Sequence, residues 1–441
     1  MYKNGLFIIA IIFLLFTSLF AQELPGFRVT GRHLYDSCGE RVILRGVANP
    51  NIWFERDGMP RYEEIEKTGA NVVRIDWETK GPAEQLDAAI SNCIKFKMIP
   101  MIELHDATGN WSKLQLCVDY WIRSDVVEVI LKHEEYLLLN IANESGDYSI
   151  SAKTFREGYE AIVKRMREAG IHVPLVIDGT DWGKNINILQ SEGPYLIEAD
   201  PDHNLIFSIH MWWPKMYGYD EDDIINEIAE SVKMELPLIV GEFSQMHGSC
   251  EEKEITANNS IAYKTIIREC YLNQIGWIAW SWFGNCNPFW DMSSKGTFET
   301  LYDWGLEVAV TDSFSIKNTS VRPYSIVNGK CNPNTVETKS DFIHPKEFDL
   351  KQNFPNPFNL NTQINYNVFS PAFITLELYD MNGHKVKRLV NDWKSTGNYM
   401  VNWNGQSDSG KVVASGVYIC QLTAKQQNDI FNKSNKLVLL K

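Results

Sequence analysis

The feature that most constrains the fold is a repeat of short apolar runs, each separated from the next by a polar or helical stretch. A run of this length and composition is typical of a strand buried on both faces, as in a parallel sheet. The expected strands are Arg41–Val47, Ala70–Asp76, Met98–Glu103, Tyr136–Asn140, Val173–Asp178, Leu205–Ile209, Pro237–Val240 and Gly276–Ser281. Strands that alternate with helices in this number, over about 300 residues, predict an α/β fold of the (β/α)8 TIM-barrel type.

Helical spacing separates these runs. It is clearest in Ser151–Ala169, whose apolar residues fall on one face and which Gly170 ends as a C-cap. We expect further helical stretches at Tyr62–Gly69, Leu86–Ile94, Tyr120–His133, Ile224–Met234 and Ile261–Asn273.

The periodicity of the chain changes near Cys331. Residues 332–349 are rich in Pro, Asn, Thr, Ser and Lys without a regular pattern, which is typical of a linker. Beyond them apolar and polar residues alternate, as in Ile364–Val368, and Asn382-Gly383 is a hairpin-type turn. We therefore expect the barrel domain at residues 22–331 and a small all-β sandwich domain at residues 350–441.

The first 21 residues have the pattern of a secretory signal peptide. Lys3 supplies the positive charge, Leu6–Phe16 is almost wholly apolar, and Ala21 is the small residue before the expected cleavage site. The apolar run is short for a membrane span, so we expect cleavage and export. Export permits disulfides among the 8 cysteines, but their spacing leaves the pairing open.

Charge and motif content exclude some classes of function. With 42 Lys and Arg against 56 Asp and Glu, the net charge is −14, which disfavours a nucleic-acid partner. The chain has neither a Cys-x-x-Cys pair nor a His-Glu-x-x-His motif, so we expect no zinc site. We also expect no other metal and no cofactor.

Polar and aromatic residues gather at the C-terminal ends of the expected strands. Barrel enzymes place their catalytic groups at these ends. A lone glutamate such as Glu144 is weak evidence, because most glutamates are solvated. Several such residues arriving from different strands are harder to explain by packing alone. The residues in question are Arg74, His105, Asn143, Glu144, His210, Glu242 and Trp280.

Glu144 and Glu242 are the expected catalytic pair, on opposite sides of a closed barrel. Cleavage of a glycosidic bond needs one carboxylic acid to protonate the leaving oxygen and one carboxylate to attack the sugar or activate water. A carboxyl separation of about 5 Å predicts retention of configuration, and a wider one predicts inversion. The sequence leaves both outcomes open.

Neighbouring residues are expected to divide the roles of the two glutamates. Burial and nearby negative charge should keep Glu144 partly protonated, whereas Arg74 should keep Glu242 ionised. Asn143 could bind the sugar 2-hydroxyl. His105 and His210 could hold sugar hydroxyls or orient the carboxylates, and the alternative is that they and Arg74 are structural.

Several motifs in one order resemble glycoside hydrolase family 5, the cellulase and mannanase family, and the likeness spans roughly residues 27–329. It is strongest to the bacterial endo-β-1,4-mannanases. The motifs are Glu103–Gly109, Val118–Trp121, Asn140–Glu144, Asp181–Gly183, Ser208–Met211, Gly241–Phe243 and Trp277–Trp282.

The resemblance implies a retaining mechanism with Glu144 as acid/base and Glu242 as nucleophile. It also implies that Trp280 is a sugar-stacking platform and that Trp182 and Trp282 bind substrate. Trp212 stands where the family usually has a tyrosine bonded to the nucleophile. An indole N–H in that place can donate a hydrogen bond but cannot accept one.

The C-terminal domain resembles the type IX secretion sorting domain. The likeness rests on Gln352–Asn359, Ser415–Tyr418 and Lys436–Lys441. It implies the outer-membrane secretion machinery as a partner, and a protein that is secreted or attached to the outer cell surface. The alternative is a carbohydrate-binding module.

Taken together, these observations predict a secreted, monomeric endo-β-1,4-mannanase that acts on plant cell-wall polysaccharide. An endoglucanase on the same scaffold is the first alternative. A non-catalytic glycan-binding protein is the second, although both carboxylates are present.

Overall fold

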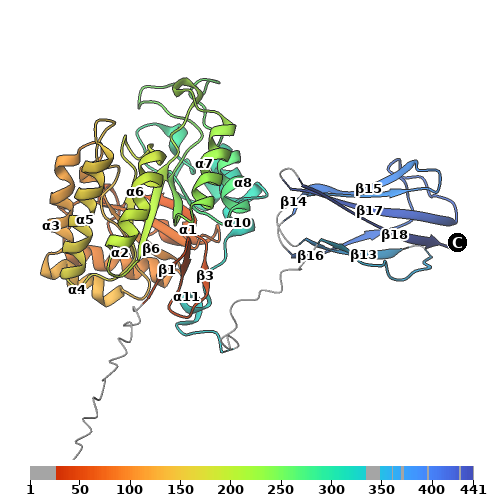
Figure 1. The fold of residues 1–441 in the computed structure, drawn as a ribbon, viewed down its shortest axis with the longest axis horizontal. Coiled ribbons are helices and arrows are strands. Elements are labelled where there is room, and N and C mark those ends of the chain that lie inside the picture. Colours follow the sequence, from red (N-terminus) through yellow and green to blue (C-terminus); the bar gives the residue numbers. More distant parts are fainter. Residues whose placement is uncertain are drawn as a thin grey trace, which may run out of the picture. The chain divides into compact units, whose positions relative to one another are not determined.

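A computed structural model describes residues 26–333, 348–359, 361–368, 372–394, 397–426 and 429–440 (Figure 1). The expected signal peptide and most of the expected linker lie outside the described residues. The chain forms two compact units, one with the barrel strands and one with the C-terminal strands. Within the described segments, no helix has the length and apolar character needed to cross a membrane.

The first unit is built on a closed barrel of parallel strands, as the sequence predicts. The closed order is β10-β11-β4-β5-β6-β7-β8-β9. The strands are β4 (Arg45–Asn49), β5 (Val72–Trp77), β6 (Ile99–Leu104), β7 (Leu138–Asn140), β8 (Leu175–Asp178), β9 (Leu205–His210), β10 (Leu238–Glu242) and β11 (Gly276–Ala279).

The start of the first barrel strand differs from the expectation. Arg41–Val42 form β3, which pairs antiparallel with β2 (His33–Tyr35), and β2 pairs with β1 (Arg28–Thr30). The barrel strand β4 begins only at Arg45. The apolar run therefore serves two sheets, a division that hydrophobicity alone does not mark.

Helices alternate with the barrel strands along the chain, and α2 to α6 lie on the outside of the strands (Figure 1). The helices are α1 (Arg61–Glu66), α2 (Ala83–Lys95), α3 (Leu114–Trp121), α4 (Ser124–His133), α5 (Ala152–Glu168), α6 (Ile186–Ala199), α7 (Glu221–Lys233), α8 (Tyr263–Leu272), α9 (Asp303–Leu306), α10 (Ile316–Thr319) and α11 (Tyr324–Asn328). Short 3-10 or π turns are η1 (Asn51–Trp53), η2 (His105–Ala107), η3 (Trp111–Lys113), η4 (Lys215–Tyr217), η5 (Pro288–Trp290), η6 (Phe298–Thr300) and η7 (Glu307–Thr311).

Two helical expectations needed correction. The stretch 120–133 is not one helix, because α3 ends at Trp121 and α4 starts at Ser124. Helix α6 was not expected, since Pro194 lies inside it and prolines disfavour helix interiors. Gly193 lets this helix approach the barrel closely, because a Cβ there would lie 2.7 Å from Leu236.

The barrel interior has two layers. Toward the N-terminal ends of the strands the inward side chains are aliphatic. They belong to one buried cluster, which contains Val72, Ile99, Met101, Leu138, Val176, Ile206, Ile239 and Ile278. Toward the C-terminal ends the inward positions carry charged and polar groups, and the candidate site is built there.

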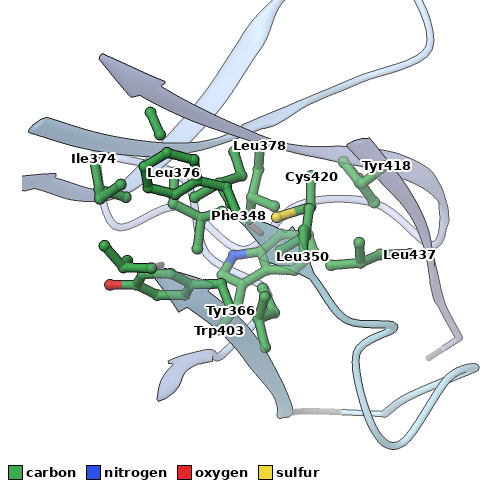
Figure 2. Close-up of a cluster of buried hydrophobic side chains, with 14 of the residues drawn as sticks. Phe348, Leu350, Tyr366, Ile374, Leu376, Leu378, Trp403, Tyr418, Cys420 and Leu437 are labelled. Carbon is green, nitrogen blue, oxygen red and sulfur yellow. The ribbon is translucent and has the colours of Figure 1, made fainter. Parts of the chain in front are cut away.

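The second unit is an all-β domain with an alternating burial pattern, as the sequence predicts. One sheet has the order β12-β13-β16, and the other has the order β15-β14-β17-β18. Their bounds are β12 (Asp349–Leu350), β13 (Thr362–Val368), β14 (Ala372–Tyr379), β15 (Lys385–Lys394), β16 (Gly397–Trp403), β17 (Gly416–Gln426) and β18 (Asp429–Leu439). Side chains of both sheets, such as Tyr366, Leu376 and Trp403, fill the core between them (Figure 2).

Candidate active site

A cavity of about 510 Å³ opens at the C-terminal ends of the barrel strands. Catalytic sites of this fold lie at these ends because side chains from many strands converge there. The lining residues are His105, Asn143, Glu144, Trp182, Lys184, Trp212, Tyr217, Glu242, His247, Gly248, Trp280 and Trp290. The structure thus brings together most of the residues that the sequence singled out.

Glu144 follows β7 in a left-handed backbone conformation, with φ of 47°. This conformation costs a non-glycine residue of order 1–3 kcal/mol and persists only where the surroundings hold it. Here the Glu144 N–H donates to Asp178 Oδ2 at 3.0 Å, and its carbonyl accepts from Gly109 N–H at 2.9 Å. The carboxylate is thereby directed to His210, whose Nδ1 lies 2.8 Å from Glu144 Oε1.

Glu242 ends β10 and is 3% exposed. Arg74 donates to its Oε1 at 2.7 Å and the Trp212 indole donates to its Oε2 at 3.1 Å. Gly241 allows this placement, since a Cβ there would lie 2.0 Å from Ser208 Oγ. Both carboxylate oxygens are therefore held before any substrate binds.

The electrostatics of Glu242 differ from the expectation. Burial raises the pKa of Glu242, and nearby Glu144 raises it further, while His210 and Arg74 lower it. The net pKa lies above the usual value, so Arg74 contacts Glu242 as expected but does not by itself offset burial.

The two glutamates lie close together. One carboxylate oxygen of each and one ring nitrogen of His210 all lie within 4.8 Å of one another. Retaining glycosidases have carboxyl groups about 5–5.5 Å apart, and inverting ones about 6.5–9.5 Å. The nearest carboxylate oxygens of the two glutamates are therefore closer than the separation typical of inverting enzymes.

Arg74 is fully buried and organises the floor of the site. Besides Glu242 it donates to Asn140 Oδ1 at 3.0 Å and to Asn143 Oδ1 at 2.6 Å. The Asn143 amide also donates to Thr108 Oγ1 at 2.9 Å. The side-chain oxygen of Asn143 thus already accepts a hydrogen bond from Arg74. The second hydrogen of its side-chain amide is the group that could donate to a sugar hydroxyl.

His210 lies between the two glutamates and is fully buried. Burial lowers its pKa, but Glu242 and Asp178 raise it more, to about 10. Glycine at 183 makes room for the ring, because a Cβ there would approach the ring within 2.6 Å. His210 is therefore an imidazolium at neutral pH, which suits the orientation of carboxylates.

His105 connects the floor to the aromatic wall. Its Nδ1 lies 2.8 Å from Glu103 Oε1, and burial is outweighed by this carboxylate, so that its pKa rises to about 9. Its ring stacks on Trp280 at 5.8 Å and meets Trp53 edge-on at 4.9 Å.

The tryptophans divide into two groups. Trp182 is 41% exposed and lines the cavity together with Trp280 and Trp212. Trp282 does not reach the cavity, contrary to the expectation that it binds substrate. It is 0% exposed, and its indole donates to Gly296 O at 2.9 Å. Its backbone N–H bonds Ala48 O, which holds this segment against β4.

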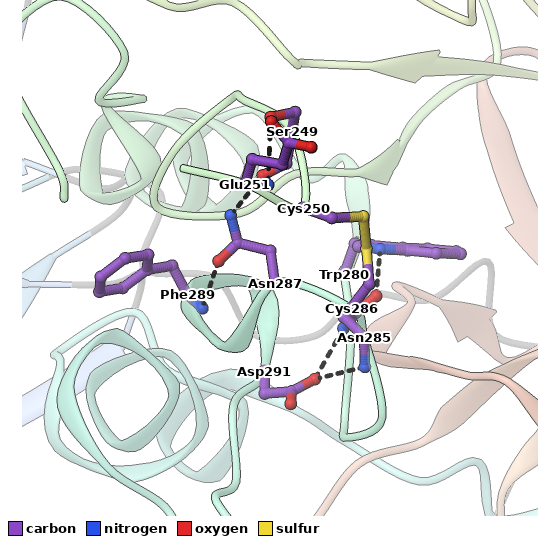
Figure 3. The surroundings of a disulfide bond; sticks show 9 residues. All are labelled: Ser249, Cys250, Glu251, Trp280, Asn285, Cys286, Asn287, Phe289 and Asp291. Atoms are coloured by element: carbon purple, nitrogen blue, oxygen red, sulfur yellow. Dashed lines mark hydrogen bonds between the residues drawn. A yellow bond between two sulfur atoms is a disulfide. The ribbon is translucent and has the colours of Figure 1, made fainter. Parts of the chain in front are cut away.

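A disulfide ties together two loops of the cavity wall. Cys250, after β10, bonds Cys286, after β11 (Figure 3). Beside it the Trp280 indole donates to Asn285 Oδ1 at 3.1 Å, and Asn285 donates to Asp291 at 2.7 Å (Figure 3). The Trp280 ring is therefore fixed on both its loop side and its His105 side.

Some residues of the site were not found from the sequence. Lys184, Tyr217, His247, Gly248 and Trp290 line the cavity from loops, where no periodicity marks them. Asp76, Glu103 and Asp178 are buried charged groups within strands. Their signal was visible, because a carboxylate inside an apolar strand needs a partner.

Among the described residues, Glu144, His210 and Glu242 are the group whose donor atoms could hold a metal ion. The two ring nitrogens of His210 lie within ion-pair range of Glu144 and Asp178. Both oxygens of Glu242 already accept hydrogen bonds.

Comparison with known proteins agrees with this geometry. The family model described as Cellulase (glycosyl hydrolase family 5) matches residues 35–285, and the FlgD Ig-like domain model matches residues 360–428. Mannan endo-1,4-beta-mannosidase of Salipaludibacillus agaradhaerens is 30% identical over 73% of this chain and 99% of its own length. The enzyme of that name from Cellvibrio japonicus is 30% identical over 67% of this chain and 68% of its own length.

A solved structure extends the likeness to three dimensions. The beta-mannanase from Thermomonospora fusca is 29% identical, with a TM-score of 0.61, over 68% of this chain and 98% of its own. The family match, the curated relatives and the barrel with its paired carboxyl groups agree: this chain belongs to glycosyl hydrolase family 5 and is a glycoside hydrolase.

Proposed function

We propose that the protein is an endo-acting β-1,4-mannanase that retains configuration through a double displacement. One observation carries the proposal. A carboxylate oxygen of Glu144, one of Glu242 and a ring nitrogen of His210 all lie within 4.8 Å of one another. The names of the curated relatives and of the solved structure support the choice of mannan.

In the first step Glu242 attacks the anomeric carbon while Glu144 protonates the leaving oxygen. Arg74 and Trp212 hold the attacking carboxylate, and His210 bridges it to Glu144. Formation of the glycosyl ester removes the negative charge of Glu242. In the second step the Glu144 carboxylate takes a proton from a water molecule. The water oxygen attacks the anomeric carbon, and the bond to Glu242 breaks, which releases Glu242 as a carboxylate.

The aromatic wall fits a polysaccharide. Trp280 and the partly exposed Trp182 offer flat apolar faces on which sugar rings can stack. The alternative is an endo-β-1,4-glucanase, which would act on cellulose. The word Cellulase in the description of the matching family favours it.

Reducing-sugar release from mannan, cellulose and xylan, measured side by side, tests the substrate. We expect release from mannan. Release from cellulose without mannan would replace the mannanase by a glucanase, and tight binding without any release would favour a non-catalytic glycan-binding protein. NMR of the first product anomer tests the mechanism, since retention gives the β-anomer first and inversion gives the α-anomer.

We further propose that residues 1–21 are a signal peptide and that residues 350–441 are a type IX sorting domain, so that the barrel domain is exported to the medium or the outer cell surface. The sequence likenesses at Gln352–Asn359 and Ser415–Tyr418 support this role. The FlgD Ig-like match is compatible with an all-β domain of either role.

Expression in a bacterium that has this secretion machinery separates the two roles. We expect the full chain to appear outside the cell and a chain that ends at residue 333 to stay inside. Equal export of both chains contradicts the sorting role, and loss of binding to insoluble mannan by the shorter chain points to a carbohydrate-binding module. Light scattering of the exported protein tests the expected monomer.

A further inference from the structure

Two buried carboxyl groups near the C-terminal ends of β5 and β6 have no part in the proposed chemistry. Asp76 on β5 and Glu103 on β6 are partners in the register of these neighbouring parallel strands. Both are 0% exposed, and neither lines the cavity. They lie in the charged layer, two residues beyond the inward positions of Arg74 and Met101.

Their hydrogen bonding is incomplete. Glu103 Oε1 meets His105, but Glu103 Oε2 and both oxygens of Asp76 lack a hydrogen-bond partner within the described structure. Arg74 Nη1 lies 3.8 Å from Asp76 and 3.9 Å from Glu103, which is ion-pair range without a short hydrogen bond. An ionised carboxylate that is buried without donors costs several kcal/mol.

The charge balance of the layer also indicates that not all of its carboxyl groups are ionised. Five carboxyl groups face three cations, so full ionisation would bury two negative charges in excess. The carboxyl groups are those of Asp76, Glu103, Glu144, Asp178 and Glu242, and the cations are Arg74, His105 and His210. Asp76 and Glu103 are neighbours in the strand register, and protonating one of two neighbouring buried carboxylates removes their repulsion.

Asp76 is the member of the pair that would hold the proton. Burial raises the pKa of Asp76 well above its usual value, Glu103 raises it further, and Arg74 and His105 oppose the rise. Glu103 instead has a direct imidazolium partner at 2.8 Å. The charged or titratable groups that face Asp76 are Arg74, Glu103, His105, Glu242 and Tyr62.

We propose that Asp76 and Glu103 hold one proton between them, on Asp76, and that the ionised Glu103 is a positioning residue that fixes His105 and, through ring stacking, Trp280. A protonated Asp76 is a donor in need of an acceptor, and Glu103 Oε2 is an acceptor in need of a donor. The single proton satisfies both residues and leaves one negative charge to hold the His105 imidazolium.

The two carboxyl groups should therefore respond differently to amide substitution. Asp76→Asn replaces a neutral acid by a neutral amide, so we expect kcat/KM within about fivefold of wild type, the worth of one neutral hydrogen bond, and an unshifted pH profile. Glu103→Gln removes the anion, so His105 loses its proton at lower pH and its ring loosens. We expect kcat/KM to fall about 10- to 100-fold and the alkaline limb to move to lower pH. A shift of that limb by Asp76→Asn overturns the proposal, because only an ionised Asp76 would cause it.

Infrared spectroscopy of the full-length protein at neutral pH gives a test that does not depend on turnover. Glu144 and Glu242 are kept, because they belong to the charge balance. We expect the difference spectrum between the wild type and Asp76→Asn to contain a protonated-carboxyl band. The difference spectrum between the wild type and Asp125→Asn, which removes an exposed aspartate whose pKa a neighbouring arginine lowers, should lack it.

Absence of any protonated-carboxyl band from the wild-type spectrum overturns the shared proton, even if the Asp76→Asn variant does not fold. The kinetic arm rests on the proposed function, whereas the infrared arm does not. A wild-type protein without mannanase activity that still shows the Asp76 band would therefore contradict the proposed function alone.

Discussion

The two layers of the barrel interior come from the same strands but differ in polarity, in charge and in their need for partners. On β5 the inward Val72 is followed two residues later by Arg74, and on β8 Val176 is followed by Asp178. The lower layer is aliphatic and close-packed, so its groups need no partners. The upper layer buries charges that are tolerable only in pairs.

The difference separates stability from chemistry within one set of strands. Aliphatic burial contributes about 1.5–3 kcal/mol per large side chain. Buried ion pairs contribute little net stability, because desolvation offsets their attraction. They do, however, shift the pKa values of groups such as His210 and Glu242, which is what acid–base chemistry needs. The upper layer is therefore maintained for function.

The largest expected effect is in the upper layer. Glu242→Gln removes the proposed nucleophile but keeps its shape, and we expect kcat/KM on mannan to fall at least about 10⁴-fold while the melting temperature changes little. Glu168→Gln, at a glutamate whose side chain is 64% exposed, is the matched control and should be neutral. Wild-type turnover by Glu242→Gln would remove this residue from the mechanism.

The next effect is in the lower layer and has the opposite character. Ile206→Ala opens a cavity at a side chain that is 2% exposed, and we expect a loss of about 2–5 kcal/mol in the free energy of unfolding. Activity at a temperature where the variant is folded should stay near wild type. Ile255→Ala, at a residue 40% exposed, should cost little. A large loss of kcat without a loss of stability would erase the distinction between the layers.

The contributions of the two layers to the free energy of unfolding should also differ in their dependence on pH. Because the folded pKa of His210 is about 10, above the usual histidine value of 6.5, its stabilising contribution is complete below pH 6.5 and is lost as the pH rises through 10. We expect the free energy of unfolding, measured with denaturant, to decrease by up to about 5 kcal/mol across this window.

Variants separate the His210 contribution from others. His210→Gln should flatten the decrease, leaving the smaller slope from His105, whose pKa is about 9. The cost of Ile206→Ala should be the same at every pH, because no titrating group is removed. An unchanged slope in His210→Gln would show that the imidazolium is not the source.

The smallest expected effect lies at the rim of the cavity. Trp182→Ala removes one stacking face, worth about 0.5–1.5 kcal/mol, so we expect KM for mannan to rise about two- to tenfold with little change in kcat. Tyr195→Ala, at an exposed ring that does not line the cavity, is the control. A fall in kcat without a change in KM would place Trp182 in the chemistry instead of in binding.

The sequence predicted the barrel strands well because apolar runs and helical spacing report burial directly. The predictions were wrong where burial alone does not decide which element or site a residue belongs to. Arg41–Val47 contains two strands of different sheets, and α6 contains a proline. Trp280 and Trp282 have the same sequence signal, but only the first reaches the cavity. The loop residues Lys184 and His247 carry no pattern that could place them.

By itself, the sequence determined that the strands alternate with helices and that Glu144 and Glu242 end two of them. These properties follow from local hydrophobicity and chain order. Only the tertiary structure decided what surrounds the two glutamates. Arg74 and Glu242 are 168 positions apart yet 2.7 Å apart in space, because barrel closure brings distant strand ends together. The ionisation of Glu242, His210 and Asp76 depends on such neighbours and on burial, so it is a property of the folded barrel and of no single segment.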